Sequence, residues 1–202
     1  MFQKPDGPAI ILASGSAIRR QLLGDAGVVF EWTAASVDED SIKQSSQAEG
    51  VMPAETAMLL AELKAARIRA PGALVIGADQ LLICEDHWFD KPRDRDDARA
   101  QLRFLRGKTH HLHTAMSVLK DGQVIWHHAA APSLVMREFS DEFLEHYLNR
   151  ELEQILHCVG GYRLEGPGAQ LFDRITGDHT TILGLPLLPL LGFLRQHGAL
   201  LK

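Results

Sequence analysis

The chain has 202 residues, of which 46% are hydrophobic and 23% charged, a composition typical of one globular domain with a sizeable core. Its formal net charge of -5 disfavours a general nucleic-acid binder, because such proteins usually present a basic face to many phosphates. No apolar run reaches the length of a membrane span, and the first residues lack the apolar region of a signal peptide. We therefore expect a cytoplasmic protein without a membrane partner, in which a few cations can still bind a small anion.

The first part of the chain predicts a strand, a tight turn, a helix and a second strand. Residues 9–13 form an apolar run that Ser14-Gly15-Ser16 interrupts. Residues 17–26 then have apolar side chains at helical spacing. Residues 28–32 favour a second strand. The turn between the first strand and the helix is the first place where polar side chains gather.

The next part predicts a loop, a helix and a buried strand. Acidic and polar residues from about 38 to 50 predict an irregular loop that can serve as a mobile flap. Pro53 suits the first turn of a helix, which Pro71-Gly72 ends. Residues 74–78 are almost continuously apolar, as in a strand covered on both faces, and we expect Asp79 at the carboxyl end of this strand.

The second half predicts helices and antiparallel strands. Asp121-Gly122 is a hairpin signal between two alternating segments, and the glycine-rich segment 158–184 predicts strands and turns. Further helices are expected at about 94–106, 140–149 and 186–196, and further strands at 109–119, 124–131 and 134–139. These elements predict an α/β fold in which helices flank a mixed sheet, within a single domain over residues 1–202.

Two serines and an arginine at the first strand-to-helix turn suggest an anion site. Ser14, Ser16 and Arg19 stand where unpaired helix N–H groups and the helix dipole favour a phosphate. By itself, the turn is explained as readily by a serine N-cap followed by solvated arginines, since no standard glycine-rich phosphate loop is present.

A lone carboxylate after a buried strand, Asp79, is costly to desolvate unless it binds a metal, pairs with a cation or acts as a base. Lys91 is a candidate cation, so a purely structural ion pair is one alternative. Glu39 can add an oxygen ligand for a divalent ion, although a solvated acidic loop explains it as well. Lys64 lies in the middle of an apolar helix, and it either extends its ammonium to solvent or binds phosphate.

Seven short motifs resemble the Maf family in order and spacing. Each motif is weak alone, but together they extend over nearly the whole chain. They are Leu12 to Leu23, Val37-Asp38-Glu39, Leu63-Lys64-Ala65, Gly77-Ala78-Asp79-Gln80, Lys91-Pro92, Gly160-Gly161-Tyr162 and Gly184-Leu185-Pro186.

This resemblance implies an elongated, ITPase-like α/β domain with a central cleft, which acts as a homodimer. It implies that the chain hydrolyses nucleoside triphosphates to the monophosphate and pyrophosphate with Mg²⁺ or Mn²⁺, in a housecleaning role linked to septum formation. By the same resemblance, Asp79 matches the family's proton acceptor, and Glu39 matches an acidic residue of its cleft that can share the metal with Asp79. The family's phosphate-contacting residues are matched by Ser16, Arg19, Lys64 and Lys91.

Three positions bear on the choice of base. The family's pyrimidine-directed branch typically has an arginine, a threonine and a glutamine where this chain has Ile18, Gln80 and Glu165. Gln80 and Glu165 resemble the branch that acts on 7-methyl-GTP, and a carboxylate can accept hydrogen bonds from guanine N1–H and its amine. That branch tends to have a tryptophan at the position of Ile18, so a broader triphosphate pyrophosphatase is the alternative.

Two non-enzymatic functions compete with this interpretation. A regulator of cell division can bind triphosphates without cleaving them, but the presence of both Asp79 and Lys91 favours turnover. A purely structural dimer module explains the leucine-rich C-terminal helix but not the clustered serine, arginine, aspartate and lysine positions.

Overall fold

The computed structural model describes residues 2–202 and confirms a mixed α/β fold with helices flanking the strands. The strands are β1 (Ile10–Leu12), β2 (Glu31–Trp32), β3 (Leu74–Cys84), β4 (His87–Phe89), β5 (Thr109–Lys120), β6 (Gln123–Ala130), β7 (Ser133–Met136) and β8 (Phe172–Thr176). The α-helices are α1 (Ala17–Asp25), α2 (Glu39–Ala48), α3 (Pro53–Ala66), α4 (Arg95–Leu105), α5 (Asp141–Ile155), α6 (His179–Ile182) and α7 (Leu187–Gln196). Two short 3-10 helices, η1 (Val159–Gly161) and η2 (Pro167–Leu171), lie in the glycine-rich segment.

The strands hydrogen-bond in the order β2-β1-β3-β5-β7-β8, with β4 beside β3 and β6 beside β5. Strand β1 is parallel to both β2 and β3, whereas the pairs involving β4, β6, β7 and β8 are antiparallel. Two compact units result. The first contains the chain up to Gln80, Thr114–Ala130 and Asp178–Lys202, and the second contains Leu81–His113 and Ala131–Gly177.

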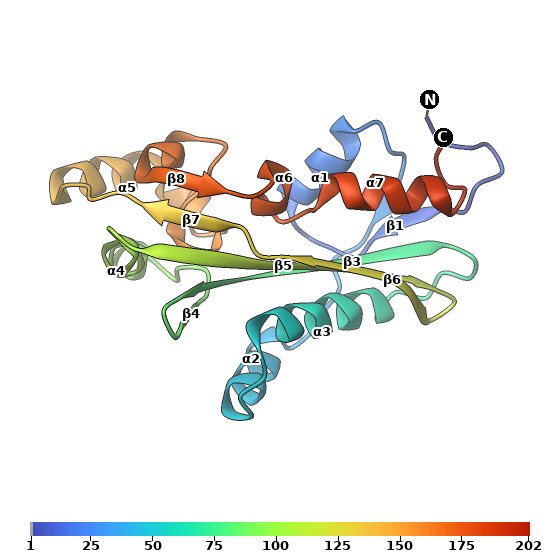
Figure 1. The fold of residues 1–202 in the computed structure, drawn as a ribbon, viewed down its shortest axis with the longest axis horizontal. Helices are drawn as coiled ribbons and strands as arrows, with labels where there is room; N and C mark the ends of the chain where they lie inside the picture. Colours follow the sequence, from blue (N-terminus) through green and yellow to red (C-terminus); the bar gives the residue numbers. More distant parts are fainter. Residues whose placement is uncertain (1) are drawn as a thin grey trace. The chain divides into compact units, whose positions relative to one another are not determined.

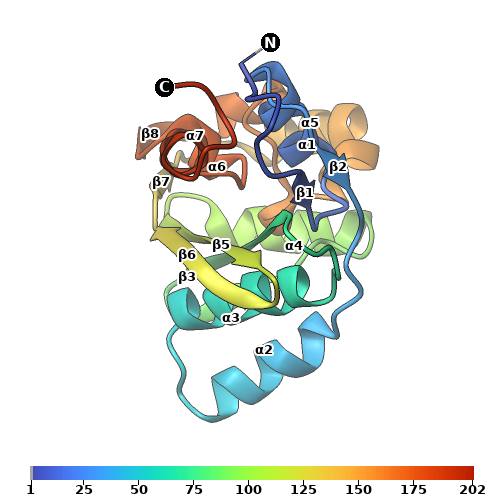
Figure 2. The ribbon, with the colours of Figure 1, turned by 90° about the vertical axis from the view of Figure 1, so that its right-hand side faces the viewer.

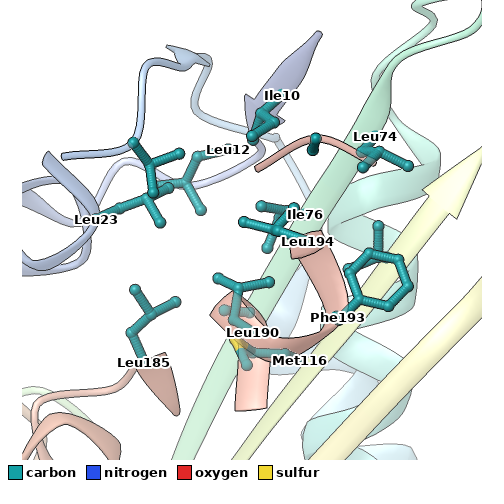
Figure 3. Packing of buried hydrophobic residues seen from close by; sticks show 14 of the residues in the cluster. Ile10, Leu12, Leu23, Leu74, Ile76, Met116, Leu185, Leu190, Phe193 and Leu194 are labelled. Carbon is teal, nitrogen blue, oxygen red and sulfur yellow. The ribbon is translucent and has the colours of Figure 1, made fainter. Parts of the chain in front are cut away.

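In the first unit, helices cover both faces of the strands. Helices α1 and α7 lie on one side of β1, β3 and β5, and α2 and α3 lie on the other (Figures 1 and 2). Figure 3 shows α7 turning Leu190, Phe193 and Leu194 toward Ile76 of β3 and Met116 of β5. These five side chains are at most 2% exposed, so this packing contributes strongly to the stability of the unit.

In the second unit, α4 packs on α5 and on η1. Both helices carry fully buried leucines, including Leu102 of α4 and Leu148 of α5. At the rim, Arg99 donates from Nε to Glu145 Oε1 (2.5 Å) and from Nη2 to Oε2 (3.0 Å), a bidentate ion pair between the two helices. Within residues 2–202, no helix combines the length and apolar character needed to cross a bilayer.

The prediction of an irregular loop or flap over residues 38–50 is wrong, because most of this segment forms helix α2. Its N-cap is Asp38, whose Oδ1 accepts a hydrogen bond from the backbone N–H of Ser41 (3.1 Å). Glu39 and Asp40 lie in the first turn, where the helix dipole favours negative charge. Glu39 therefore stands on the first turn of a capped helix.

The expectation that Asp79 follows the end of its strand is also wrong. Strand β3 continues through Asp79 to Cys84. The parallel pairing with β1 ends at the Leu12–Ile76 pair, and the next residue, Ala13, donates its N–H to the Ile76 carbonyl (2.8 Å). Asp79 thus lies just beyond the point where β1 turns away, within a strand that goes on.

Helix α3 approaches β3 so closely that only glycine fits at position 77. A Cβ on Gly77 would overlap the carbonyl oxygen of Ala61 and would lie 3.0 Å from the nitrogen of Ala65. We expect Gly77→Ala to lower the free energy of unfolding by about 3 kcal/mol, because the helix backbone must move. Urea unfolding measures this change. Gly24→Ala, whose new Cβ meets nothing within 4 Å, is the control and should stabilise α1 slightly; equal losses in both variants would contradict the prediction.

Candidate active site

The turn after β1 positions two serine hydroxyls at the start of α1. Ser16 is the N-cap, and its Oγ accepts from the N–H of Arg19 (3.4 Å). Ser14 is only 6% exposed, and its Oγ accepts from the N–H of Ser16 (3.3 Å) and from Arg19 Nη1 (3.3 Å). The N-cap interpretation is therefore confirmed for Ser16. The first turn of α1 also carries Ile18, which is half-buried.

Arg19 is not a solvated side chain. Its Nε donates to the Gly184 carbonyl (2.8 Å) and its Nη1 donates to the Ala78 carbonyl (2.8 Å), so the guanidinium joins α1, β3 and the segment after α6. Burial lowers the pKa of Arg19, and the charges of Asp79 and Glu39 oppose this shift. The guanidinium stays protonated at neutral pH. Two of the three guanidinium nitrogens, Nε and Nη1, thus donate to protein oxygens.

Lys64 brings the two candidate acidic residues together. Its Nζ donates to Asp79 Oδ1 in a short contact and lies 2.7 Å from Glu39 Oε1. The Lys64 side chain is 11% exposed, which rules out the alternative that it extends into solvent. Sequence reasoning named Lys91 as the cation for Asp79, but in the structure Lys64 pairs with this carboxylate. Sequence position alone does not reveal this pairing, because it depends on how α3 crosses β3.

Asp79 is buried, at 4% exposure, and one of its oxygens lacks a partner. Burial raises the pKa of Asp79, and the charges of Lys64 and Arg19 oppose the shift. Oδ2 has no hydrogen-bond partner among the described residues. A buried carboxylate oxygen without a partner is costly unless a ligand, water or metal ion satisfies it. One oxygen of Asp79 is therefore held by Lys64, and the other can bind a ligand or accept a proton.

The donor set fits a divalent cation that a substrate helps to hold. Within residues 2–202, no three His, Cys, Asp or Glu side chains cluster as a complete metal site. Mg²⁺, however, is usually bound by one or two carboxylates together with substrate phosphates and water. Asp79 Oδ2 and the half-exposed carboxylate of Glu39 are oxygen donors of the kind that such a site uses.

The side-chain nitrogen of Gln80 is already engaged. Its Nε2 donates to Thr114 Oγ1 (2.7 Å) and lies within hydrogen-bonding distance of the carbonyls of Thr181 (3.2 Å) and Ile182 (3.1 Å). The sequence did not indicate these partners, since Thr114 and Thr181 are distant along the chain and belong to no recognised motif.

The second unit carries the other two predicted residues, Lys91 and Glu165, both of which are exposed. Both lie near the thiol of Cys158. Burial and the charge of Glu165 raise the pKa of Cys158 to about 11, and the charges of Arg163 and Lys91 oppose the shift. Pro92, next to Lys91, is buried and would lie 3.4 Å from a Cβ on Gly161. The glycine-rich turn and the Lys91-Pro92 motif are thus in close contact.

Comparisons with known proteins agree with this arrangement of motifs. The family model of Maf-like proteins matches residues 9–197. A nucleoside triphosphate pyrophosphatase of Granulibacter bethesdensis is 58% identical over 193 residues, which cover 95% of this chain and 98% of the relative. One from Rhodospirillum rubrum is 53% identical over 197 residues, or 96% of this chain and 98% of the relative. A 7-methyl-GTP pyrophosphatase of Rhizobium meliloti is 44% identical over 195 residues, with 96% and 98% covered. The chain therefore belongs to the Maf-like protein family.

Proposed function

We propose that this chain is a nucleoside triphosphate pyrophosphatase, which cleaves the bond between the α and β phosphates to give the monophosphate and pyrophosphate. The observation that carries this proposal is the unpartnered Oδ2 of buried Asp79, beside the cations Lys64 and Arg19. The similar proteins named as nucleoside triphosphate pyrophosphatases support the same reaction.

The reaction needs a water activated next to the α-phosphorus. Asp79 Oδ2 accepts a proton from this water, whose oxygen forms the new bond to phosphorus while the bridging oxygen leaves with pyrophosphate. Lys64 holds the other Asp79 oxygen, so the carboxylate keeps one orientation. Arg19 Nη2, Ser14 and Ser16 lie around the start of α1, where a phosphate is favoured. Lys91 of the second unit stays a prediction as a further phosphate contact.

A divalent cation, Mg²⁺ or Mn²⁺, suits the charge balance of the first unit. The two cations Lys64 and Arg19 face the two carboxylates of Asp79 and Glu39, so these four groups offer a triphosphate no net positive charge. The metal would be held by Asp79 and Glu39, and it would supply charge neutralisation for the phosphates.

For the base, we propose that the protein prefers 7-methyl-GTP and that Glu165 recognises the base by hydrogen bonds. The 7-methylguanine ring carries a positive charge, and its N1–H and amine are donors that a carboxylate can accept. Glu165 is exposed and therefore accessible to a base. Ile18 and the Gln80 carbonyl oxygen are the other candidate contacts. The 7-methyl-GTP pyrophosphatase among the similar proteins supports this preference.

Pyrophosphate release with Mg²⁺ from 7-methyl-GTP, GTP, dTTP, UTP and CTP tests both proposals. We expect 7-methyl-GTP to give the highest kcat/KM. Glu165→Gln should lower kcat/KM for 7-methyl-GTP about 10- to 100-fold relative to UTP, because the amide nitrogen cannot accept a hydrogen bond. Glu142→Gln, the same change at an exposed position of α5, is the control and should leave the ratio unchanged.

The outcomes separate reaction from specificity. An unchanged substrate ratio in Glu165→Gln, with turnover intact, contradicts the role of Glu165 only. If the protein binds triphosphates but does not cleave them, the proposed enzymatic activity is wrong, and the alternative function as a regulator of cell division takes its place. We also propose a cytoplasmic homodimer that acts on modified nucleotides; sedimentation of the purified protein tests the dimer.

A further inference from the structure

The two residues that flank Asp79 are linked to one short segment of the chain, Ala78 through Arg19 and Gln80 through its own side chain. Before Asp79, Arg19 donates to the Ala78 carbonyl and, through Nε, to the Gly184 carbonyl (both 2.8 Å). After Asp79, Gln80 Nε2 reaches the carbonyls of Thr181 (3.2 Å) and Ile182 (3.1 Å). We call the segment Thr181–Gly184 the carbonyl strap.

Thr114 joins this network from β5. Its hydroxyl accepts from Gln80 Nε2 (2.7 Å) and donates to the Thr181 carbonyl (3.2 Å), so one buried hydroxyl connects the residue after Asp79 with the strap. Thr114 is 1% exposed. Buried hydrogen bonds of this kind are costly to leave unmade, and they hold their members in one geometry.

The carbonyl strap is held at both of its ends. Asp178 caps α6: its Oδ2 accepts from the N–H of Thr181 (2.7 Å) and from the Thr181 hydroxyl (2.9 Å). At the far end, Gly184 has φ of +95°, and a Cβ there would lie 3.2 Å from Arg19 Nε. Glycine is thus favoured at position 184 both by backbone conformation and by the close approach of the arginine.

We propose that the carbonyl strap positions Asp79 for catalysis, with Thr114 as the positioning residue that links it to Gln80. The inference rests on the proposed function and adds residues that act through Asp79 without touching the substrate. Misplacement of a reacting group by about 1 Å can lower a rate about 10²-fold. A network that fixes both neighbours of Asp79 can therefore control turnover.

Thr114→Val tests the proposal, because valine keeps the shape of threonine and removes both hydrogen bonds. We expect kcat for triphosphate cleavage to fall about 10- to 100-fold and KM to change much less, since the phosphate contacts remain and only Gln80 among the proposed base contacts loses a partner. Thr114→Ser, which keeps the hydroxyl, should restore kcat. In a crystal structure of Thr114→Val, the Asp79 carboxylate should be displaced from Lys64.

Thr56→Val is the matched control. Thr56 is also fully buried, and its hydroxyl donates within α3 to the Met52 carbonyl (3.3 Å), away from the strap. Equal kcat values in Thr114→Val and Thr56→Val, or an Asp79 side chain that has not moved in Thr114→Val, would overturn the proposal. If the wild-type protein cleaves no triphosphate, the proposed function fails, and the position of Asp79 in the two crystal structures still decides whether the strap positions it.

Discussion

Asp79→Asn is expected to lower kcat about 10³-fold while triphosphate binding persists. The amide keeps the size of the carboxylate but cannot accept a proton from water, and general bases typically contribute about 10²- to 10⁴-fold. Pyrophosphate release measures the loss, and calorimetry with a non-hydrolysable α,β-imido triphosphate measures binding. In the same assay, Asp25→Asn, an exposed position of α1, should have wild-type kcat.

The pH dependence of the wild-type enzyme gives a second measure of the role of Asp79. Burial raises the pKa of Asp79, although Lys64 and Arg19 oppose the shift. As the pH falls through this raised pKa, the base is protonated, so kcat/KM should be lost at a pH above the ordinary aspartate value of about 3.9. Wild-type turnover in Asp79→Asn would rule out Asp79 as the base, and an acid limb at or below the ordinary value would contradict the raised pKa.

Much of the fold could be predicted because its signals are local. The apolar run of β1, the serine cap of α1 and the uninterrupted apolar strand before Asp79 each depend on neighbouring residues. Helix α2 was missed because its composition is polar and no apolar stripe marks it. The signal that could have identified it is the capping residue Asp38 followed by Glu39 and Asp40.

The candidate site was only partly predictable. The motifs named Glu39, Lys64 and Asp79, but their mutual contact depends on the crossing of α3 over β3, which Gly77 permits and no local pattern reveals. The hydrogen bonds of Gln80 depend on residues 34 and 101 positions away in sequence, so periodicity carries no information about them. Long-range pairing of polar groups is thus where sequence reasoning stops.

Lys64→Met is expected to lower the free energy of unfolding and to make that free energy depend more strongly on Mg²⁺. Removing the ammonium takes away the cation that bridges the carboxylates of Asp79 and Glu39, and breaking a buried ion pair costs about 3 kcal/mol. Urea unfolding in the presence of a chelator measures this loss. The loss should shrink in acidic buffer, because the raised pKa of Asp79 allows protonation to remove one of the two facing charges.

Mg²⁺ should restore part of the stability of Lys64→Met, because a cation that binds only the folded state stabilises it by mass action and replaces the missing ammonium. Wild type, in which Lys64 already bridges the two carboxylates, should gain less. Turnover should still fall about 10²-fold, since Asp79 loses the group that orients it. Lys120→Met, at an exposed position, is the control for the loss of one charge. Equal stabilisation of wild type and Lys64→Met by Mg²⁺ would show that the metal does not use the two carboxylates that Lys64 bridges.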